Sequence, residues 1–315
     1  MMRLILAISL SMVYQLTAWG QADQEWPLIT ELSFIVNPAL VSEAEDLAIV
    51  ASHGKKWRRI RSSPSQSNIG LILPFSDVNM TCGAQVFSES VGPFKSVGTR
   101  LAYAYQFRLS RIRTDQLSLG LSTRLMHIKF DQEHFINNDV SDPLVQDIET
   151  NGFVPPSFSA GFHYRTGVAN YATPVQFTIS GSVGKVIPFE DRFGSFSLDR
   201  TFQWYGSAGL DIAANADMVV QPVLLYSHIA QRPGNLGFRT SAHHRRFGWV
   251  MLQYERTKIL TSQIGINVNL GPLNMDIFQV SFSNGWHVGP INGQLGNSFT
   301  FGVVYKRGYR SRTGQ

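Results

Sequence analysis

Residues 97–110, VGTRLAYAYQFRLS, alternate between two kinds of side chain with a period of two. One set of alternate positions is apolar or aromatic apart from a single threonine: Val97, Thr99, Leu101, Tyr103, Tyr105, Phe107 and Leu109. The positions between them are small, polar or charged: Gly98, Arg100, Ala102, Ala104, Gln106, Arg108 and Ser110. Because successive side chains of a strand point to opposite faces, the pattern predicts a β-strand with one apolar face, not a helix.

The same alternation returns along most of the chain, for example over 201–212 and 259–270. Each alternating run has about ten residues, which is the length that a tilted strand needs to cross the hydrocarbon core of a membrane. Taken between turn residues, the runs predict about fourteen strands, an even number. The predicted strands are 46–57, 65–74, 79–88, 95–109, 115–128, 156–165, 174–186, 201–212, 217–228, 234–242, 246–254, 259–270, 273–283 and 295–306.

Two fold classes produce such alternation, a closed membrane barrel and a pair of soluble β-sandwiches. The regular strand length, the lack of a linker and polar faces rich in Gly, Ala and Ser favour the barrel. A mean hydropathy of −0.05 is consistent with it, because only alternate residues of a barrel strand face lipid. We therefore predict an all-β, closed antiparallel transmembrane β-barrel in a bacterial outer membrane.

The N-terminus carries Arg3, an apolar run over 4–14 and the small-residue site Ala18-Trp19-Gly20, which is the order of a signal peptide. A buried first strand or a short membrane anchor is the alternative, although the run is short for a span. The predicted organisation has four parts. They are a signal peptide at 1–20, a periplasmic N-terminal segment and possible plug at 21–45, the barrel at 46–306, and a polar tail at 307–315.

Connection lengths give the predicted barrel an orientation, because outer-membrane barrels have short periplasmic turns and long external loops. The even-to-odd joins are short, as at 76–78, 213–216 and 271–272, whereas the longest segments, 129–155, 187–200 and 284–294, are odd-to-even joins. The sixth join, near 167–173, and the ninth, near 230–233, depart from this trend. The trend predicts that both termini lie in the periplasm.

Composition argues against a nucleic-acid partner and against an intrachain disulfide. With 27 Lys and Arg against 22 Asp and Glu, the net charge of +5 is too small and too scattered for a nucleic-acid partner. The single cysteine, Cys82, excludes an intrachain disulfide, so backbone pairing and packing must hold the fold together.

A family resemblance appears from Phe34 to Tyr164. The segment after the predicted signal contains Asn37-Pro38-Ala39, and the first strand ends in Lys55-Lys56-Trp57. Further matching stretches follow it in the chain: Gly70-Leu71, Ala102-Tyr103-Ala104-Tyr105, Leu117-Ser118-Leu119-Gly120-Leu121, Asp142-Pro143 and Pro155-Pro156-Ser157-Phe158. With these features the chain resembles the PorP/SprF family of the Bacteroidota type IX secretion and gliding machinery. It departs from the usual pattern in Leu40 and Val41 and in the lysines before Trp57.

The resemblance implies an outer-membrane component that assists the export or surface attachment of adhesin-type substrates with C-terminal secretion signals. It implies other type IX secretion proteins as partners on the periplasmic side, and contact with outer-membrane lipid. It implies no enzyme activity and no cofactor. The alternative that the residues leave open is a channel or small-molecule transporter, porin-like or FadL-like. That alternative rests on the polar residues assigned to the lumen face: Arg100, Gln106, Arg108, Asn267 and Asn269.

The candidate site residues are Asn37, Pro38, Ala39 and Trp57, with a structural or partner-contact role. Pro38 fixes its own φ and pushes Asn37 to an extended conformation, so a segment reaching in from the periplasm should bend there. Two interpretations remain, a plug that closes the barrel base and a direct partner contact. The plug is favoured.

No residue is predicted to be catalytic, cofactor-binding or metal-binding. His127 lies on the apolar side of its strand, and the sequence assigns it no catalytic partner. Segment 129–155 is acidic but lacks the spacing and central glycine of a calcium loop. Its length makes it the best external candidate for partner binding.

Overall fold

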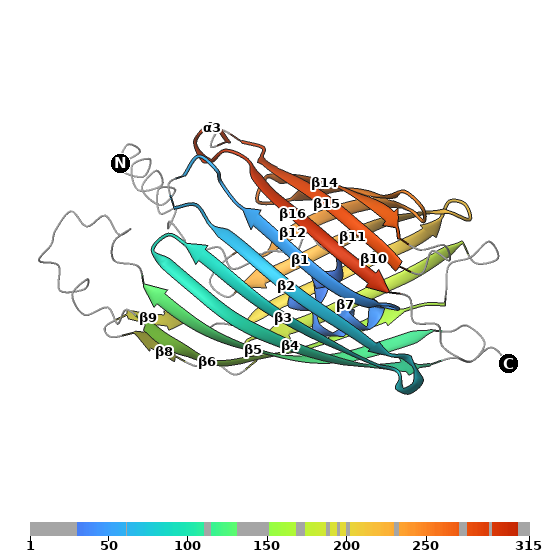
Figure 1. Ribbon diagram of the computed structural model, residues 1–315, viewed down its shortest axis with the longest axis horizontal. Coiled ribbons are helices and arrows are strands. Elements are labelled where there is room, and N and C mark those ends of the chain that lie inside the picture. Colours follow the sequence, from blue (N-terminus) through green and yellow to red (C-terminus); the bar gives the residue numbers. More distant parts are fainter. Residues whose placement is uncertain are drawn as a thin grey trace, which may run out of the picture.

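In the computed structural model the chain forms one closed antiparallel barrel of 14 strands, which confirms the predicted fold class and excludes the pair of sandwiches (Figure 1). The structure describes residues 30–60, 62–109, 115–130, 151–167, 174–186, 190–193, 196–199, 202–229, 233–270, 276–289 and 292–307. None of the helices among these residues is long and apolar enough to cross a membrane.

The barrel strands follow one another around the wall in chain order. They are β1 (Leu47–Lys55), β2 (Ser65–Phe75), β3 (Met80–Val91), β4 (Phe94–Arg108), β5 (Gln116–Phe130), β6 (Asn151–Arg165), β7 (Val175–Gly184), β10 (Gln203–Ala213), β11 (Met218–Ile229), β12 (Asn235–His244), β13 (Gly248–Glu255), β14 (Ile259–Asn269), β15 (Asp276–His287) and β16 (Ser298–Arg307). β1 pairs with β16, with Leu47 opposite Arg307, and this pairing closes the sheet.

The predicted phase of the alternation is confirmed. On β4, Val97 and Leu101 are each 55% exposed on the outer wall, whereas Ala102 and Ala104 on the inner wall are 5% and 0% exposed. Because the outward positions carry exposed, large apolar side chains, the outer wall suits lipid.

The two ends of the barrel are named here by β1. The proximal end is where β1 begins and β16 ends, and the distal end is where β1 ends (Figure 1). The proximal connections that the structure describes in full are short, such as the 3₁₀ turn η3 (Ser76–Val78) between β2 and β3. Both chain ends of the barrel therefore emerge on the same side, while the side itself, the periplasm, stays a prediction.

The structure moves three predicted boundaries. One is in segment 284–294, which was predicted as loop but contains the end of β15, at His287. Segment 129–155 was predicted as loop, but β5 runs to Phe130 and β6 begins at Asn151. Pro155 and Pro156 hid this strand, since proline normally ends a ladder, and a register shift between Arg124 and Met126 of β5 accommodates them. Segment 187–200, also predicted as loop, contains a hairpin of β8 (Glu190–Phe193) and β9 (Phe196–Asp199).

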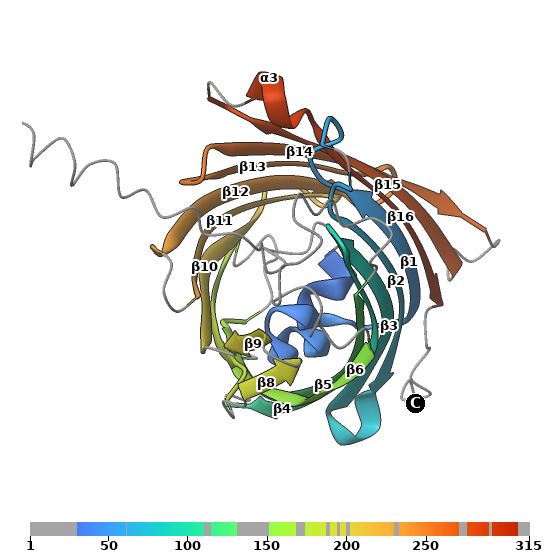
Figure 2. The ribbon, with the colours of Figure 1, turned by 90° about the vertical axis from the view of Figure 1, so that its left-hand side faces the viewer.

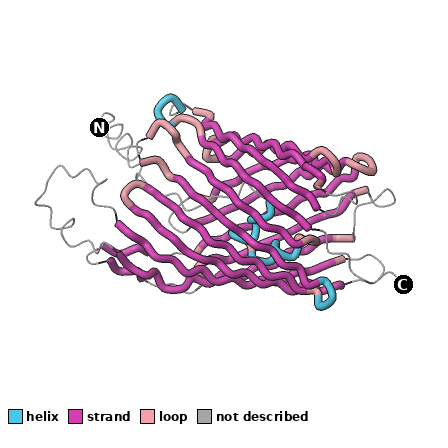
Figure 3. The backbone as a smooth tube through the Cα atoms, in the orientation of Figure 1, coloured by secondary structure: helices cyan, strands magenta, loops and turns pink. Residues whose placement is uncertain are grey.

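Three further short helices lie among the described residues. They are η1 (Thr30–Ile35), η2 (Pro38–Glu43) and, before β16, α3 (Asn292–Leu295). The tube view in Figure 3 shows η1 and η2 inside the ring of strands, and the view along the barrel in Figure 2 shows them against its inner wall. Residues 30–44, called the N-terminal segment from here on, therefore occupy the lumen.

Candidate functional site

The candidate site is built around the bend between η1 and η2. Asn37 is extended, with φ −135° and ψ 110°, and Pro38 is the first residue of η2. This is the conformation expected for a residue before proline. The bend returns the chain on itself inside the barrel, so Asn37, Pro38 and Ala39 are all buried.

The side-chain amide of Asn37 makes one hydrogen bond with each of its two polar ends. Its Oδ1 accepts from the backbone N–H of Ala39 at 3.0 Å, which caps η2. Its Nδ2 donates to the carbonyl oxygen of Phe162 on β6, also at 3.0 Å. One side chain thus both starts the helix and attaches it to the barrel wall.

The wall beneath this bend is a rung of small residues. Ala104, Gly120, Gly161 and Ser182 are consecutive cross-strand partners on β4, β5, β6 and β7. A Cβ added at Gly120 would lie 2.3 Å from the backbone nitrogen of Ala39, and one at Gly161 would lie 2.1 Å from Asn37 Oδ1. The backbone of the segment approaches Gly120, and the side chain of Asn37 approaches Gly161, so closely that only glycine fits at these two positions.

A third contact fixes the entry to the bend. Ser182 Oγ, at the end of the same rung, donates to the carbonyl oxygen of Val36 at 2.7 Å. Ser42 Oγ donates to Ser118 Oγ at 2.7 Å on β5. The bend is therefore tied to β5, β6 and β7 by side-chain hydrogen bonds.

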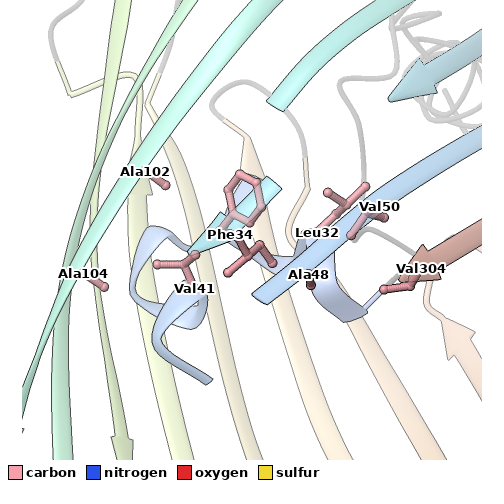
Figure 4. Close-up of a cluster of buried hydrophobic side chains, with 9 residues drawn as sticks. Leu32, Phe34, Val41, Ala48, Val50, Ala102, Ala104 and Val304 are labelled. Carbon is pink, nitrogen blue, oxygen red and sulfur yellow. The ribbon is translucent and has the colours of Figure 1, made fainter. Parts of the chain in front are cut away.

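The apolar face of the N-terminal segment packs on another part of the wall. Leu32, Phe34 and Val41 are at most 2% exposed. They form one cluster with inward residues of β1, β2, β4 and β16: Ala48, Val50, Ile72, Ala102, Ala104 and Val304 (Figure 4). Full burial of such side chains contributes roughly 1.5–3 kcal/mol each, so the hydrophobic effect dominates the attachment of the segment.

A separate apolar contact reaches β10 and β11. Val36 packs with Leu225, with Tyr205 and Val223 beside them. The N-terminal segment therefore touches β1–β4 through one set of side chains and β11 through another. Together with the hydrogen bonds of the bend, these contacts attach the segment to one continuous arc of the wall, from β16 through β1 to β11.

The charged end of the segment meets charged residues of the wall. Glu43, the last residue of η2, forms an ion pair with His163 of β6, with 3.0 Å between Oε1 and Nε2. The His163 side chain is 7% exposed and that of Glu43 is 38% exposed. Burial raises the pKa of Glu43, but the charge and hydrogen bond of His163 and the charges of Arg165 and Arg239 outweigh it, so the pKa lies below its ordinary value.

The structure separates Trp57 from the other predicted site residues. Trp57 follows β1 at the distal end, with a left-handed φ of 51°, and its N–H donates to Ser298 Oγ at 3.4 Å. The nine residues of β1 rise about 30 Å between this end and the other. Asn37, Pro38 and Ala39 form one site, and Trp57 is not part of it.

The other sequence candidates lie apart from the bend. His127 is on the outward face of β5, opposite Val97. Most of the acidic segment, 131–150, lies outside the described residues. Among the described residues, no group of three or more His, Cys, Asp or Glu side chains is placed to hold a metal ion.

Sequence reasoning missed the wall side of the site: Glu43, Ser118, Gly120, Gly161, His163 and Ser182. One signal for it was present. Gly70, Gly83, Gly120 and Gly161 all occupy inward positions of predicted strands, and a glycine inside a strand often marks the close approach of another backbone. All four glycines face the N-terminal segment.

Solved structures of similar fold are bacterial membrane channels. The toluene transporter TodX of P. putida matches with a TM-score of 0.52 and 7% identity, over 88% of this chain and 94% of that one. The CymD monoaromatic hydrocarbon channel matches with a TM-score of 0.53 and 9% identity, over 90% and 93% of the two chains. At such identity the likeness shows the barrel fold alone.

Sequence comparisons give a more specific result. A family model described as "Type IX secretion system membrane protein PorP/SprF" matches residues 24–305. No curated protein matches the chain. The family match includes the bend, its wall and all 14 barrel strands except the last residues of β16.

Proposed function

Since the chain belongs to the PorP/SprF family of type IX secretion system membrane proteins, and is thus an outer-membrane component of that system, we propose that it assists the export or surface attachment of adhesin-type substrates carrying C-terminal secretion signals. In this proposal the barrel is a plugged platform for protein contacts, not an open pore. Its partners are other secretion proteins on the periplasmic side and the substrate itself.

The proposal of a plugged platform is supported by the close fit of the N-terminal segment against the inner wall of the barrel. Asn37, Gly120 and Gly161 fit one another so closely that the segment has a single position on the wall. The apolar contacts of Phe34 on one side and Val36 on the other give it support across the lumen. A chain segment bound in this way obstructs solute passage, which favours contacts with proteins as the function.

The proposed position of the partners, at the proximal end, follows from where the N-terminal segment joins β1. The described proximal connections are short, which is typical of periplasmic turns, and the N-terminal segment enters the barrel next to the start of β1. Residues that leave the lumen at this end would meet periplasmic components of the secretion machine. The exposed Glu45, directly after the segment, is the kind of residue that such a partner would meet.

A gene-deletion strain tests the secretion role. We expect it to lose surface retention of substrates with C-terminal signals, measured by surface labelling and by the substrate released to the medium, and expect the wild-type gene to restore retention. A deletion strain that exports and retains all such substrates would contradict the proposal. A variant of Lys258, an exposed distal residue remote from the N-terminal segment, serves as a complementation control.

The second candidate is a channel or small-molecule transporter. The polar lumen and the barrel likeness to TodX and CymD favour it. Two of the lumen residues on which this alternative rests already form hydrogen bonds with neighbouring side chains of the wall. Gln106 donates to Gln116 at 2.8 Å, and Asn267 accepts from Gln279 at 3.0 Å. Conductance of the purified protein in planar bilayers distinguishes the two, since steady large conductance supports a channel and near-silence supports the plugged platform.

A further inference from the structure

One sector of the barrel, formed by the neighbouring strands β16, β1 and β2, contains no acidic residue. The sequence has no Asp or Glu between Asp46 and Asp77, and none after Asp276. Positive charge is concentrated in the same sector, from the last residue of β1 onward. Five basic residues occur there within seven positions: Lys55, Lys56, Arg58, Arg59 and Arg61. No carboxylate of these three strands can balance this charge.

Two of these basic side chains lie on the outer wall at the distal end. Lys55 is exposed and has the outward phase of β1, since Val50, of the opposite phase, is buried in the lumen. The cross-strand partners of Lys55 are Phe299 of β16 and Ser65 of β2. The exposed Arg58 lies over the Phe299 ring, with 5.4 Å between its Cζ atom and the ring centroid. Because Phe299 is directly opposite Lys55, the two cations are close together on the outer wall.

The loop that carries Arg58 is attached to the connection before β16. The backbone N–H of Arg58 donates to the carbonyl oxygen of Asn297, and that of Arg59 donates to the carbonyl oxygen of Leu295, each at 3.2 Å. The loop therefore lies beside α3 (Figure 2). Because the backbone is already fixed, little conformational freedom of the loop is lost when an anion binds to it.

Along the outer face of β1 and β2 the wall changes from charged to apolar. The next outward cross-strand pair is His53 and Ser67, whose side chains share a hydrogen bond of 2.9 Å. Beyond this neutral polar pair, Ile69 and Ile49 are 64% and 47% exposed. Ile69 lies about 13 Å along β2 from Ser65. Phosphate, ester and acyl groups follow one another in the same order in a membrane lipid.

We propose that Lys55 and Arg58, together with the hydroxyl group of Ser65, bind the phosphate group of a membrane lipid whose acyl chains lie along Ile69 and Ile49. An ammonium group, a guanidinium group and a hydroxyl group supply the donors that a phosphate accepts. The apolar wall beside them commits the site to a lipid, because a free phosphate ion would gain nothing from Ile69. The site is on the outer wall, independent of the N-terminal segment and of the secretion role.

Native mass spectrometry of the full chain in detergent tests the site with dioleoylphosphatidic acid and dioleoylglycerol, which differ only in the phosphate group. We expect the wild type to retain the phosphatidic acid at least about tenfold better, since hydrogen bonds to charged groups are strong. The double variant Lys55→Gln/Arg58→Gln should lose this preference. The matched control is Arg256→Gln/Lys258→Gln, which also removes one arginine and one lysine, from exposed positions of the distal turn between β13 and β14. It should keep the preference.

A charge-preserving variant separates recognition of phosphate from damage to the loop. Lys55→Arg/Arg58→Lys exchanges the two basic side chains and keeps both charges, so it should keep most of the preference for phosphatidic acid. A loss as large as in the glutamine variant would mean that the conformation of the loop, and not its charge, determines retention, and it would contradict the site.

Four other outcomes would also overturn the proposal. Equal retention of both lipids by the wild type would mean that phosphate is not recognised. A preference that survives in the glutamine variant would place recognition elsewhere. Displacement of phosphatidic acid by an equal concentration of glycerol 3-phosphate, which has no acyl chains, would show an ion site rather than a lipid site. Displacement by a polyglutamate peptide at equal concentration would indicate an acidic protein partner.

Discussion

Two parts of the lumen wall differ in chemistry although the same alternation of side chains produces both. Beneath the N-terminal segment the inward residues of β4–β6 include Ala104, Gly120 and Gly161. On β13–β15 the corresponding inward residues include Gln253, Gln263 and Gln279, all at most 7% exposed. Small inward residues occur where another part of the chain packs, and inward amides occur where the wall has to satisfy its own polar groups.

The polar part of the wall does this in part, with side-chain hydrogen bonds around Glu255. Glu255 of β13 accepts from Gln253 of the same strand at 2.8 Å through one carboxylate oxygen and from Asn235 of β12 at 2.8 Å through the other. The buried Oε1 atoms of Gln263 and Gln279 have no hydrogen-bond partner among the described residues. Nothing comparable is needed around Gly120, where the backbone of the N-terminal segment fills the space. The contrast indicates that the lumen was adapted to hold this segment on one side only.

The largest expected effect tests the close approach itself. Gly120→Ala forces a methyl group against the Ala39 backbone, which cannot move aside as a side chain can, so we expect a loss of about 3 kcal/mol in unfolding free energy. Gly184→Ala is the matched control, since its Cβ would make only ordinary contacts at 3.5 Å or more on the same inner wall. Urea unfolding of the refolded barrels measures both. Equal losses in the two variants would contradict the comparison.

The second effect concerns the attachment of the bend. Asn37→Ala removes the cap of η2 and the bond to Phe162, and we expect it to cost about 1–2 kcal/mol and to increase hydrogen exchange in residues 30–43. Asn37→Asp keeps the cap acceptor but places a buried carboxylate oxygen against the carbonyl oxygen of Phe162, so it should increase exchange at least as much as Asn37→Ala. Unchanged exchange in Asn37→Ala would show that the apolar cluster alone holds the segment.

Much of this site followed from sequence and part of it could not. Asn37-Pro38 predicted an extended residue and a bend, because the constraint acts within two neighbouring residues. The partners Phe162 and Gly161 lie 125 and 124 positions away in the chain, and their approach depends on barrel closure and register. Strand positions were predictable from alternation. Pro155 and Pro156 misled the prediction of β6 because the register shift that accommodates them is a property of the pair of strands.

A third, smaller effect depends on pH. The lowered pKa of Glu43 means that the folded barrel favours the carboxylate, so this stabilisation is present above the ordinary carboxyl pKa and is lost as pH falls through the lowered one. His163 and Arg165 of β6, Asp211 of β10 and Arg239 of β12 act electrostatically on this group.

We therefore expect the protection of the amides in residues 30–43, measured as exchange relative to the intrinsic rate at each pH, to fall on acidification below the ordinary carboxyl range, and Glu43→Gln to lack this fall. The control is Glu45→Gln, since Glu45 is exposed two residues further on. The interpretation would be wrong if Glu45→Gln abolished the pH response and Glu43→Gln preserved it. Arg239→Gln should weaken the response without removing it, because the His163 contact remains.

The smallest expected effect is the coupling between Asn37 and Trp57 in unfolding free energy, which should be close to zero. Both residues belong to the sequence features that resemble the family, yet they lie near opposite ends of β1, which is about 30 Å long. Distant sites without shared partners change stability additively, so Asn37→Ala and Trp57→Ala should combine to within about 0.5 kcal/mol in urea unfolding. Asn37 is buried in the lumen, whereas Trp57 follows β1 at the distal end, and the described hydrogen bonds give them no common partner. If the double variant instead showed a coupling of several times that size, the proximal bend and the distal end of β1 would have to respond to each other through the wall, and the bend would not be a site separate from that end.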